Sequence, residues 1–281
     1  MRIILVSAAV TMLTACGASG GGSQVVAAFY PLAFAAQTIG GPSLHVRNLT
    51  PSGAEPHDIE LTPQEVTEIQ RARLVLYLSH GFQPAVEEAV QGASEKRLDA
   101  LQGIGLRRGV GDEAGKTDPH VWLDPVLFAR IVRRIGAALG HPRAAAALAA
   151  KADALDGEYR AGLSDCARRT FVTSHAAFGY LAARYGLHQV AITGLDPEAE
   201  PTARRLASLA ALVRRLGTRT VFFERLVSPK LADTVAREAG VHTAVLDPIE
   251  GLTPAEASHG TTYLSLMRQN LRALRSALQC R

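Results

Sequence analysis

Short runs of β-branched and aliphatic residues alternate along this chain with stretches whose apolar positions recur at helical spacing. The runs are typical of buried strands, and we expect strands at residues 25–29, 45–49, 74–78, 170–173, 189–192, 220–223 and 243–246. Helices are expected at residues 31–39, 63–72, 83–91, 125–139, 143–165, 176–185, 201–216, 229–238 and 261–278. Regular βα alternation predicts an α/β fold with parallel sheets covered by helices on both faces.

The strands fall into two groups separated by a region without strands. That region is rich in Ala, Leu and Arg, and its pattern predicts two helices. The break between them lies at Gly140-His141-Pro142, where proline prevents the first helix from continuing. We therefore predict an N-terminal βα lobe at residues 24–124, a helical linker at 125–168 and a C-terminal βα lobe at 169–281. A helical connection resists bending, so only a small closure of the lobes is expected.

The first 23 residues have the pattern of an export signal. Arg2 precedes an apolar run over residues 3–13, and Leu13-Thr14-Ala15-Cys16 resembles a bacterial lipobox. The run is too short to span a bilayer. We expect residues 1–16 to be a lipoprotein signal with lipidation at Cys16, and 17–23 to be a flexible tether. This predicts an exported protein anchored to the outer face of the cytoplasmic membrane; the alternative is an ordinary cleaved signal with a chance cysteine.

The charge and cysteine content of the chain narrow the possible functional classes and indicate one disulfide. The net charge is +4, but the arginines occur as pairs inside helical patterns and no nucleic-acid-binding motif is present, which favours solvated helix faces over nucleic-acid binding. Without Cys16, an even pair remains, Cys166 and Cys280. An exported protein tolerates disulfides, so a bridge between them is expected, with two unpaired buried thiols as the alternative.

Three histidines and one aspartate are the strongest candidates for chemistry. His57, His175 and Asp247 follow predicted strands, and His120 lies in a proline-flanked loop that enters the linker. In open α/β sheets the carboxyl ends of strands form the ligand crevice, so these side chains can converge there. Imidazole nitrogens and a carboxylate oxygen suit Zn²⁺ and similar divalent ions, so we expect a metal cleft between the lobes.

At this point several blocks of the sequence resemble a known family, the zinc and manganese solute-binding lipoproteins of bacterial ABC importers. The blocks that carry the resemblance are Phe29-Tyr30-Pro31, residues 51–63, the segment 118–125, residues 174–180 and Leu246-Asp247-Pro248. The resemblance implies that His57 and His120 are ligands from the N-terminal lobe and that His175 and Asp247 are ligands from the C-terminal lobe. It also implies delivery of the metal to a permease in the cytoplasmic membrane.

The choice of metal depends on the residue at position 175. Family members associated with manganese tend to carry glutamate there, so His175 favours Zn²⁺, with Mn²⁺ as the alternative. Many zinc-specific members also carry a long histidine-rich loop before the second ligand block, whereas this chain has only residues 107–117 there. A metal-scavenging role is therefore not expected for that loop.

Four further residues are weaker candidates near the same cleft. Glu55 is an alternative ligand, and His80 an auxiliary contact or a surface residue at a helix start. Glu200 and Glu224 could each accept the second N–H of a ligating imidazole, or could instead be helix-terminal charges or interface ion pairs.

Four protein ligands would fill a tetrahedral shell, which predicts capture of zinc without catalysis. The main alternatives are a manganese receptor of the same kind and a secreted zinc hydrolase, although the chain lacks His-Glu-x-x-His and Gly-x-Ser-x-Gly. A cell-adhesion protein is a third reading, and it would require an exposed apolar or aromatic patch. We expect a monomer whose transport energy comes from a separate ATPase, and an affinity that falls as pH drops through the histidine range near ~6.5.

Overall fold

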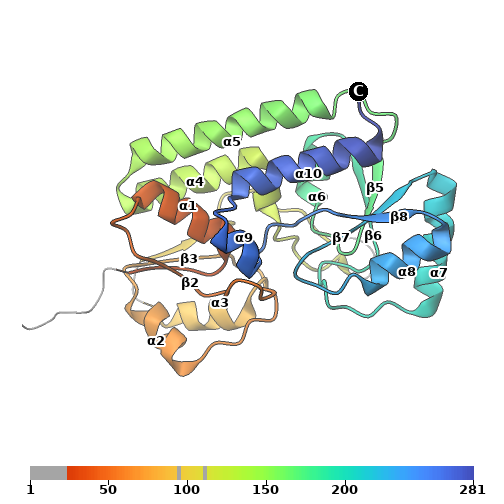
Figure 1. The fold of residues 1–281 in the computed structure, drawn as a ribbon. Helices are drawn as coiled ribbons and strands as arrows, with labels where there is room; N and C mark the ends of the chain where they lie inside the picture. Colours follow the sequence, from red (N-terminus) through yellow and green to blue (C-terminus); the bar gives the residue numbers. More distant parts are fainter. Residues whose placement is uncertain (1–23, 94–95, 110–112) are drawn as a thin grey trace, which may run out of the picture.

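The computed structural model describes residues 24–93, 96–109 and 113–281 (Figure 1). Two four-stranded parallel sheets organise this part of the chain. Their strands are β1 (Val25–Ala27), β2 (Val46–Asn48), β3 (Leu74–Tyr77), β4 (Arg97–Asp99), β5 (Thr170–Thr173), β6 (His188–Ala191), β7 (Thr220–Phe223) and β8 (His242–Val245). The helices are α1 (Tyr30–Gly40), α2 (Pro63–Arg71), α3 (Pro84–Gln91), the 3₁₀ turn η2 (Val121–Leu123), α4 (Pro125–Leu139), α5 (Pro142–Gly162), α6 (Gly179–Arg184), α7 (Ala203–Leu216), α8 (Lys230–Ala239), α9 (Pro254–Ser258) and α10 (Tyr263–Leu278).

Both sheets repeat one strand order. The N-terminal sheet runs β2-β1-β3-β4 and the C-terminal sheet β6-β5-β7-β8, with every pairing parallel. In each sheet the chain first steps to one side and then crosses to the other, so the order reverses between β1 and β3 and between β5 and β7. The loops that leave these strands open the crevice where α/β sheets hold their ligands.

The helices α4 and α5 connect the two sheets and pack closely on each other. At Gly136, a Cβ atom would lie 2.1 Å from the Cβ of Ala145, so only glycine permits this approach. Figure 1 shows α5 and α10 side by side above the sheets, and Tyr159 of α5 donates a hydrogen bond to the carbonyl of Met267 at 2.7 Å. The linker is therefore part of the packed structure and does not hang free between the lobes.

One hydrophobic core runs through both lobes. It contains Phe29 and Leu76 beside the first sheet, Ile131 in the linker, and Phe171 and Tyr263 on the C-terminal side. A second, smaller core lies between β5, β7 and the helices α7 and α8. Because packed cores deform little, the continuous core supports the expectation of small relative movements of the lobes.

The predicted α/β class with two parallel-sheet lobes is confirmed. Most predicted strands and helices are present with ends shifted by one to three residues. Three elements were missed: β4 and the 3₁₀ turn η2, which are three residues long each, and α9, which is five residues long. All three are too short to show a clear periodicity.

The predicted bridge between Cys166 and Cys280 is present, across 114 positions of sequence. It attaches the C-terminal end of the chain to the segment just after α5. The predicted lipobox and its Cys16 lie outside the described residues. None of the helices in the described part has the length and apolar character needed to cross a bilayer.

Removing the bridge should lower the stability of the protein without changing its fold. Closing a loop of this length restricts the unfolded chain, and the entropic effect is worth up to about 5 kcal/mol. We expect the Cys166→Ser/Cys280→Ser variant to unfold at lower denaturant concentration, with an unchanged far-UV spectrum. Parent protein treated with a reductant is the matched control, and equal midpoints for parent and variant would contradict the prediction.

Candidate metal centre

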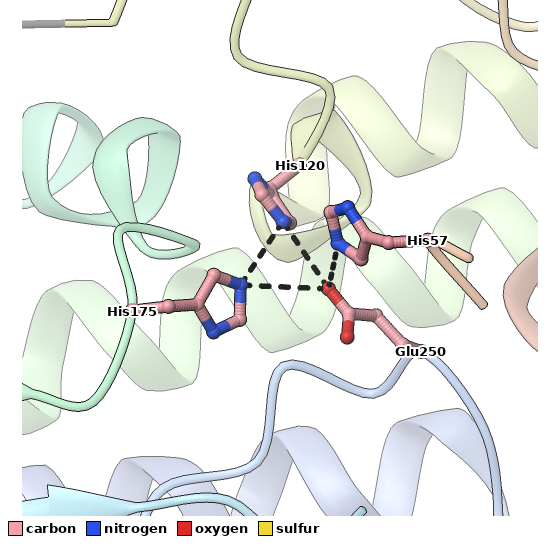
Figure 2. A group of neighbouring side chains, drawn as sticks. All are labelled: His57, His120, His175 and Glu250. Carbon is pink, nitrogen blue, oxygen red and sulfur yellow. Dashed lines mark hydrogen bonds and ion pairs between the residues drawn. The ribbon is translucent and has the colours of Figure 1, made fainter. Parts of the chain in front are cut away.

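Four side chains from distant parts of the sequence meet between the two sheets: His57, His120, His175 and Glu250 (Figure 2). Each offers one donor atom, and these atoms lie within 4.8 Å of one another. Nε2 of His120 is 3.3 Å from Nε2 of His175, and Oε1 of Glu250 is 3.2, 3.4 and 3.7 Å from Nε2 of His120, His57 and His175. Figure 2 shows all four donors turned toward a common centre.

These separations match the size of a small tetrahedral metal site. Bonds of 2.0–2.1 Å from zinc to nitrogen place neighbouring ligand atoms of a tetrahedron about 3.3 Å apart. The His120–His175 pair and the three pairs that include Glu250 have donor separations of 3.2 to 3.7 Å, close to that value, and all four donor atoms lie within 4.8 Å of one another. The four side chains can therefore hold a divalent transition ion with little rearrangement.

His120 is oriented by the carboxylate two residues before it. Its Nδ1 lies 2.8 Å from Oδ1 of Asp118, which also accepts the backbone N–H of His120 at 3.0 Å. The hydroxyl of Tyr180 donates to the Asp118 carbonyl at 2.9 Å and fixes this segment from α6. With its proton on Nδ1, the ring directs the Nε2 lone pair to the centre. Tyr180 thus ties a segment before the linker to the C-terminal lobe.

His175 is held in the same way from β7. Its Nδ1 lies 2.6 Å from Oε1 of Glu224, which also accepts the hydroxyl of Ser174. The His175 carbonyl accepts hydrogen bonds from Thr173 and Gln189 at 2.7 and 2.9 Å. The expectation that Glu224 accepts an imidazole N–H agrees with this geometry. Because β5 and β7 are adjacent at the point where the strand order reverses, their loops bring histidine and carboxylate together.

Burial and mutual charge set the electrostatics of the centre. His120 and His175 are fully buried, and Glu250 is 2% exposed. Burial alone would raise the pKa of Glu250, but hydrogen bonds with His120 and His57 outweigh it and keep the pKa well below its usual range. Burial would likewise lower the pKa of His120, yet hydrogen bonds to Asp118 and Glu250 raise it to about 9. In the metal-free protein, protonated His120 and ionised Glu250 thus stabilise each other.

His57 forms the more accessible side of the centre, with its side chain 12% exposed. Its ring packs edge-on against Phe82, with centroids 4.7 Å apart, and its backbone N–H donates to Oε2 of Glu55 at 2.8 Å. The other oxygen of Glu55 lies 4.0 Å from His57 Nε2. Burial and the nearby charge of Glu250 raise the pKa of Glu55 to about 9. Glu55 is therefore adjacent to the four donors but is not one of them.

The expectation that Asp247 supplies the carboxylate is wrong for this geometry. Its Oδ1 accepts the backbone N–H of Ile249 at 2.7 Å, and its Oδ2 lies 3.4 Å from Nη1 of Arg225. These contacts turn the carboxylate away from the imidazoles. Glu250, three residues further along, is the acid that reaches them.

Two of the weaker candidates lie apart from the four donors. His80 is exposed in the loop after β3, and its backbone N–H faces the carboxylate of Glu87. Glu200 is exposed and lines a separate cavity beside the edge strand β6, together with Arg107 and Arg205. The structure supports neither an auxiliary metal contact for His80 nor an imidazole contact for Glu200.

Sequence reasoning missed two residues of the centre, Glu250 and Asp118. A signal existed for both. Glu250 belongs to the same loop after β8 as Asp247, so the loop offered two acids for one position. Asp118 lies two residues before His120, a spacing that lets one carboxylate bind both the backbone and the ring of the histidine.

The comparisons with known proteins agree with this geometry. Residues 25–277 match the family model described as zinc-uptake complex component A, periplasmic (ZnuA). The chain belongs to this family. It is 37% identical over 284 residues to the zinc-binding protein AdcA of Streptococcus pyogenes, covering 90% of this chain and 55% of AdcA. The chain thus spans about half the length of the curated relatives of this kind.

Other relatives match along almost their whole length. The high-affinity zinc uptake system protein ZnuA of Bacillus subtilis is 34% identical, over 98% of this chain and 97% of ZnuA. The Zn(II)-bound ZnuA-like domain of Streptococcus pneumoniae AdcA superimposes with a TM-score of 0.79 at 36% identity, over 92% of this chain and 99% of the domain. The laminin-binding protein of Streptococcus agalactiae, described as a bifunctional protein with adhesin and metal transporting activity, gives a TM-score of 0.82 at 32% identity, over 92% of this chain and all of the other.

Weakening the carboxylates behind the imidazoles should lower metal affinity without removing a ligand. Replacement of such partners typically costs about 10- to 100-fold in affinity. We expect this loss of zinc affinity for Asp118→Asn and for Glu224→Gln, measured by competition with a chromogenic chelator. Asp153→Asn, which changes an exposed acid of α5, is the control and should bind like the parent. Parent-like affinity in both test variants would show that the tautomers are set in another way.

Proposed function

We propose that this protein captures Zn²⁺ outside the cytoplasmic membrane and delivers it to the permease of an ABC importer. The observation that carries the proposal is the convergence of three imidazole nitrogens and one carboxylate oxygen within 4.8 Å of one another, in a site where three of the four residues are buried. The ion is the transported cargo. Family membership and the zinc-binding relatives support the same reading.

A binding role fits this donor set better than catalysis. A hydrolytic zinc site keeps one position for an activated water, whereas here His57, His120, His175 and Glu250 provide four donors. His120 and His175 are also fully buried, which leaves little room for a substrate beside the ion. The proposal therefore excludes the secreted hydrolase.

Zinc is the favoured ion because of donor chemistry. Three nitrogens and one oxygen suit Zn²⁺, whereas Mn²⁺ prefers carboxylate and water oxygens in larger shells. The orientation of His120 by Asp118 and of His175 by Glu224 strengthens the two nitrogen donors further.

The remaining parts of the proposal concern the membrane anchor, the oligomeric state and the lobes of the receptor. In the proposal, Cys16 is lipidated and residues 17–23 tether the protein to the outer face of the membrane. The protein acts as a monomer, with lobes at residues 24–124 and 169–281 and a linker at 125–168. The permease receives the ion from the cleft between the lobes.

Adhesion is a second candidate activity, favoured by the likeness to the laminin-binding protein of Streptococcus agalactiae. Among the residues that the structure describes, Leu216 is the exposed large hydrophobic side chain. An adhesive surface on the described part would therefore consist mainly of polar and charged residues, and immobilised laminin with and without zinc is the direct assay.

Loss of one central imidazole should nearly abolish zinc capture. Sharing the binding free energy of a four-ligand zinc site among its ligands gives a loss on the order of 100- to 1,000-fold per ligand. We expect this for His120→Ala in calorimetric zinc titrations, with manganese binding weaker than zinc in the parent. His141→Ala, at an exposed position before α5, is the control.

The same variants should show in cells whether zinc uptake depends on zinc binding at the centre. A strain that lacks the gene should grow poorly when zinc is chelated, and the parent gene and His141→Ala should restore growth while His120→Ala should not. Parent-like zinc binding by His120→Ala would overturn the ligand assignment. Growth rescue without zinc binding would overturn the proposed function.

Zinc affinity should rise with pH over a range above that of an ordinary histidine. Zinc needs the neutral imidazole of His120, whose pKa in the metal-free protein is raised to about 9. If one proton is displaced, the apparent Kd falls about tenfold per pH unit up to about pH 9 and then levels off. Calorimetry at pH 7, 8 and 9 in buffers of different ionisation enthalpy measures both the affinity and the proton release.

The stability of the metal-free protein should change in the opposite direction. Because the folded pKa of His120 lies above the unfolded value of about 6.5, its contribution is fully present below pH 6.5 and is lost as the pH rises through 9. A pH-independent Kd together with pH-independent stability of the metal-free protein would contradict this account.

A further inference from the structure

The turn that presents Glu250 contacts the neighbours of all three histidines. Trp122, two residues after His120, donates its indole N–H to the carbonyl of Pro248 at 2.7 Å. Gly53, in the loop that carries His57, donates its backbone N–H to the carbonyl of Leu252 at 2.8 Å. The turn at residues 247–252 is therefore attached to both segments that supply the N-terminal histidines.

Ile249, in the middle of this turn, has a backbone conformation that isoleucine rarely adopts. Its φ is +58°, in the left-handed region, and its side chain is fully buried. A β-branched residue at positive φ is strained, and such strain persists only where surrounding contacts determine the conformation. The contacts of the turn must therefore favour this conformation enough to offset the strain.

Asp247 provides the contacts that hold the strained residue. Its Oδ1 accepts the N–H of Ile249 at 2.7 Å. Its own backbone is fixed by Asn270 of α10, whose side chain accepts the N–H of Asp247 at 2.9 Å and donates to its carbonyl at 2.6 Å. The side chain of Asp247 is 8% exposed, so water competes little for these hydrogen bonds.

Arg225 connects this turn to the partner of the third histidine. It directly follows Glu224, which binds Nδ1 of His175. Its guanidinium reaches Oδ2 of Asp247 at 3.4 Å, forms an ion pair with Glu256 of α9, and donates to Gln269 at 3.1 Å. The contacts of Arg225 and Asp247 thus join the two ligand-bearing segments of the C-terminal lobe.

We propose that Asp247 is a positioning residue: through Ile249 and Arg225 it fixes the turn that places the Glu250 carboxylate against the three imidazoles, and so controls how tightly the ion is retained. This inference rests on the proposed function and adds the residue that prepares the carboxylate ligand. Asp247 acts through Glu250 and does not itself bind the ion.

The first test compares two replacements of Asp247. Asparagine keeps an oxygen that can accept the Ile249 N–H, and it loses only the charge that faces the partly exposed Arg225. The zinc affinity of Asp247→Asn should therefore lie within about fivefold of that of the parent. Alanine removes the acceptor, so Asp247→Ala should lose about 10- to 100-fold in affinity, mainly through faster zinc release. Arg225→Gln, the milder variant, should lose about two- to fivefold. The control is Asp233→Asn, an exposed acid on α8.

The second test asks whether Asp247 acts through Glu250. In a double-mutant cycle, Asp247→Ala should weaken zinc binding in the parent but add little in the Glu250→Gln background, because the carboxylate it positions is gone. Cobalt-loaded Asp247→Ala should show the same change in its visible spectrum as cobalt-loaded Glu250→Gln. A purely structural role would lower the unfolding temperature and leave the cobalt spectrum unchanged.

The outcomes separate this inference from the proposed function. If the parent binds zinc tightly and Glu250→Gln weakens it, but Asp247→Ala binds like the parent or the two losses multiply independently, the positioning role is overturned alone. If the parent does not bind zinc, the proposed function fails first. If Asp247→Ala proves unfolded by circular dichroism, Arg225→Gln decides: parent-like affinity and zinc release rate in that variant overturn the proposal.

Discussion

The close approach of His120, His175 and Glu250 is the constraint on which the rest of this structure depends. Three polar groups from different segments occupy a fully buried space, with donor atoms 3.2 to 3.7 Å apart. Burying such groups is costly unless each has a partner. Asp118 and Glu224 provide partners on the outer sides of the imidazoles, and a divalent cation would provide one on the inner side. The site is thus oriented for an ion before the ion arrives.

The scaffold meets this constraint through its topology. Two sheets with the same strand order direct the carboxyl ends of their strands toward each other, and a packed helical linker fixes their separation. His175 and Glu224 follow adjacent strands, and Glu250 follows β8 in the same sheet. The loops that present the ligands can therefore differ in length, while the strands that precede them stay paired in one register.

Tight capture and timely release make different demands on the same four donors. His57 and Glu55 form the more accessible side of the site, whereas His120 and His175 are enclosed. The strained turn at Ile249 adds a ligand whose position depends on Asp247 and its hydrogen bonds. Two imidazoles are oriented by carboxylates, and the carboxylate ligand stands on a turn that depends on Asp247, so the site can hold zinc strongly and still lose one ligand when that turn is disturbed.

The sequence alone determined the α/β class, the two groups of strands and the candidate histidines, and it favoured a bridge between Cys166 and Cys280. These features depend on local periodicity, on the rule that loops after parallel strands form the crevice, and on a count of cysteines. Only the tertiary structure decided which acid of the loop after β8 faces the histidines. Asp247 and Glu250 both lie in that loop, and their roles depend on the left-handed backbone at Ile249 and on the contacts from Arg225, Asn270 and Trp122. Those contacts come from residues more than 20 positions away, so no local pattern could reveal that one carboxylate secures the turn while the other reaches the centre.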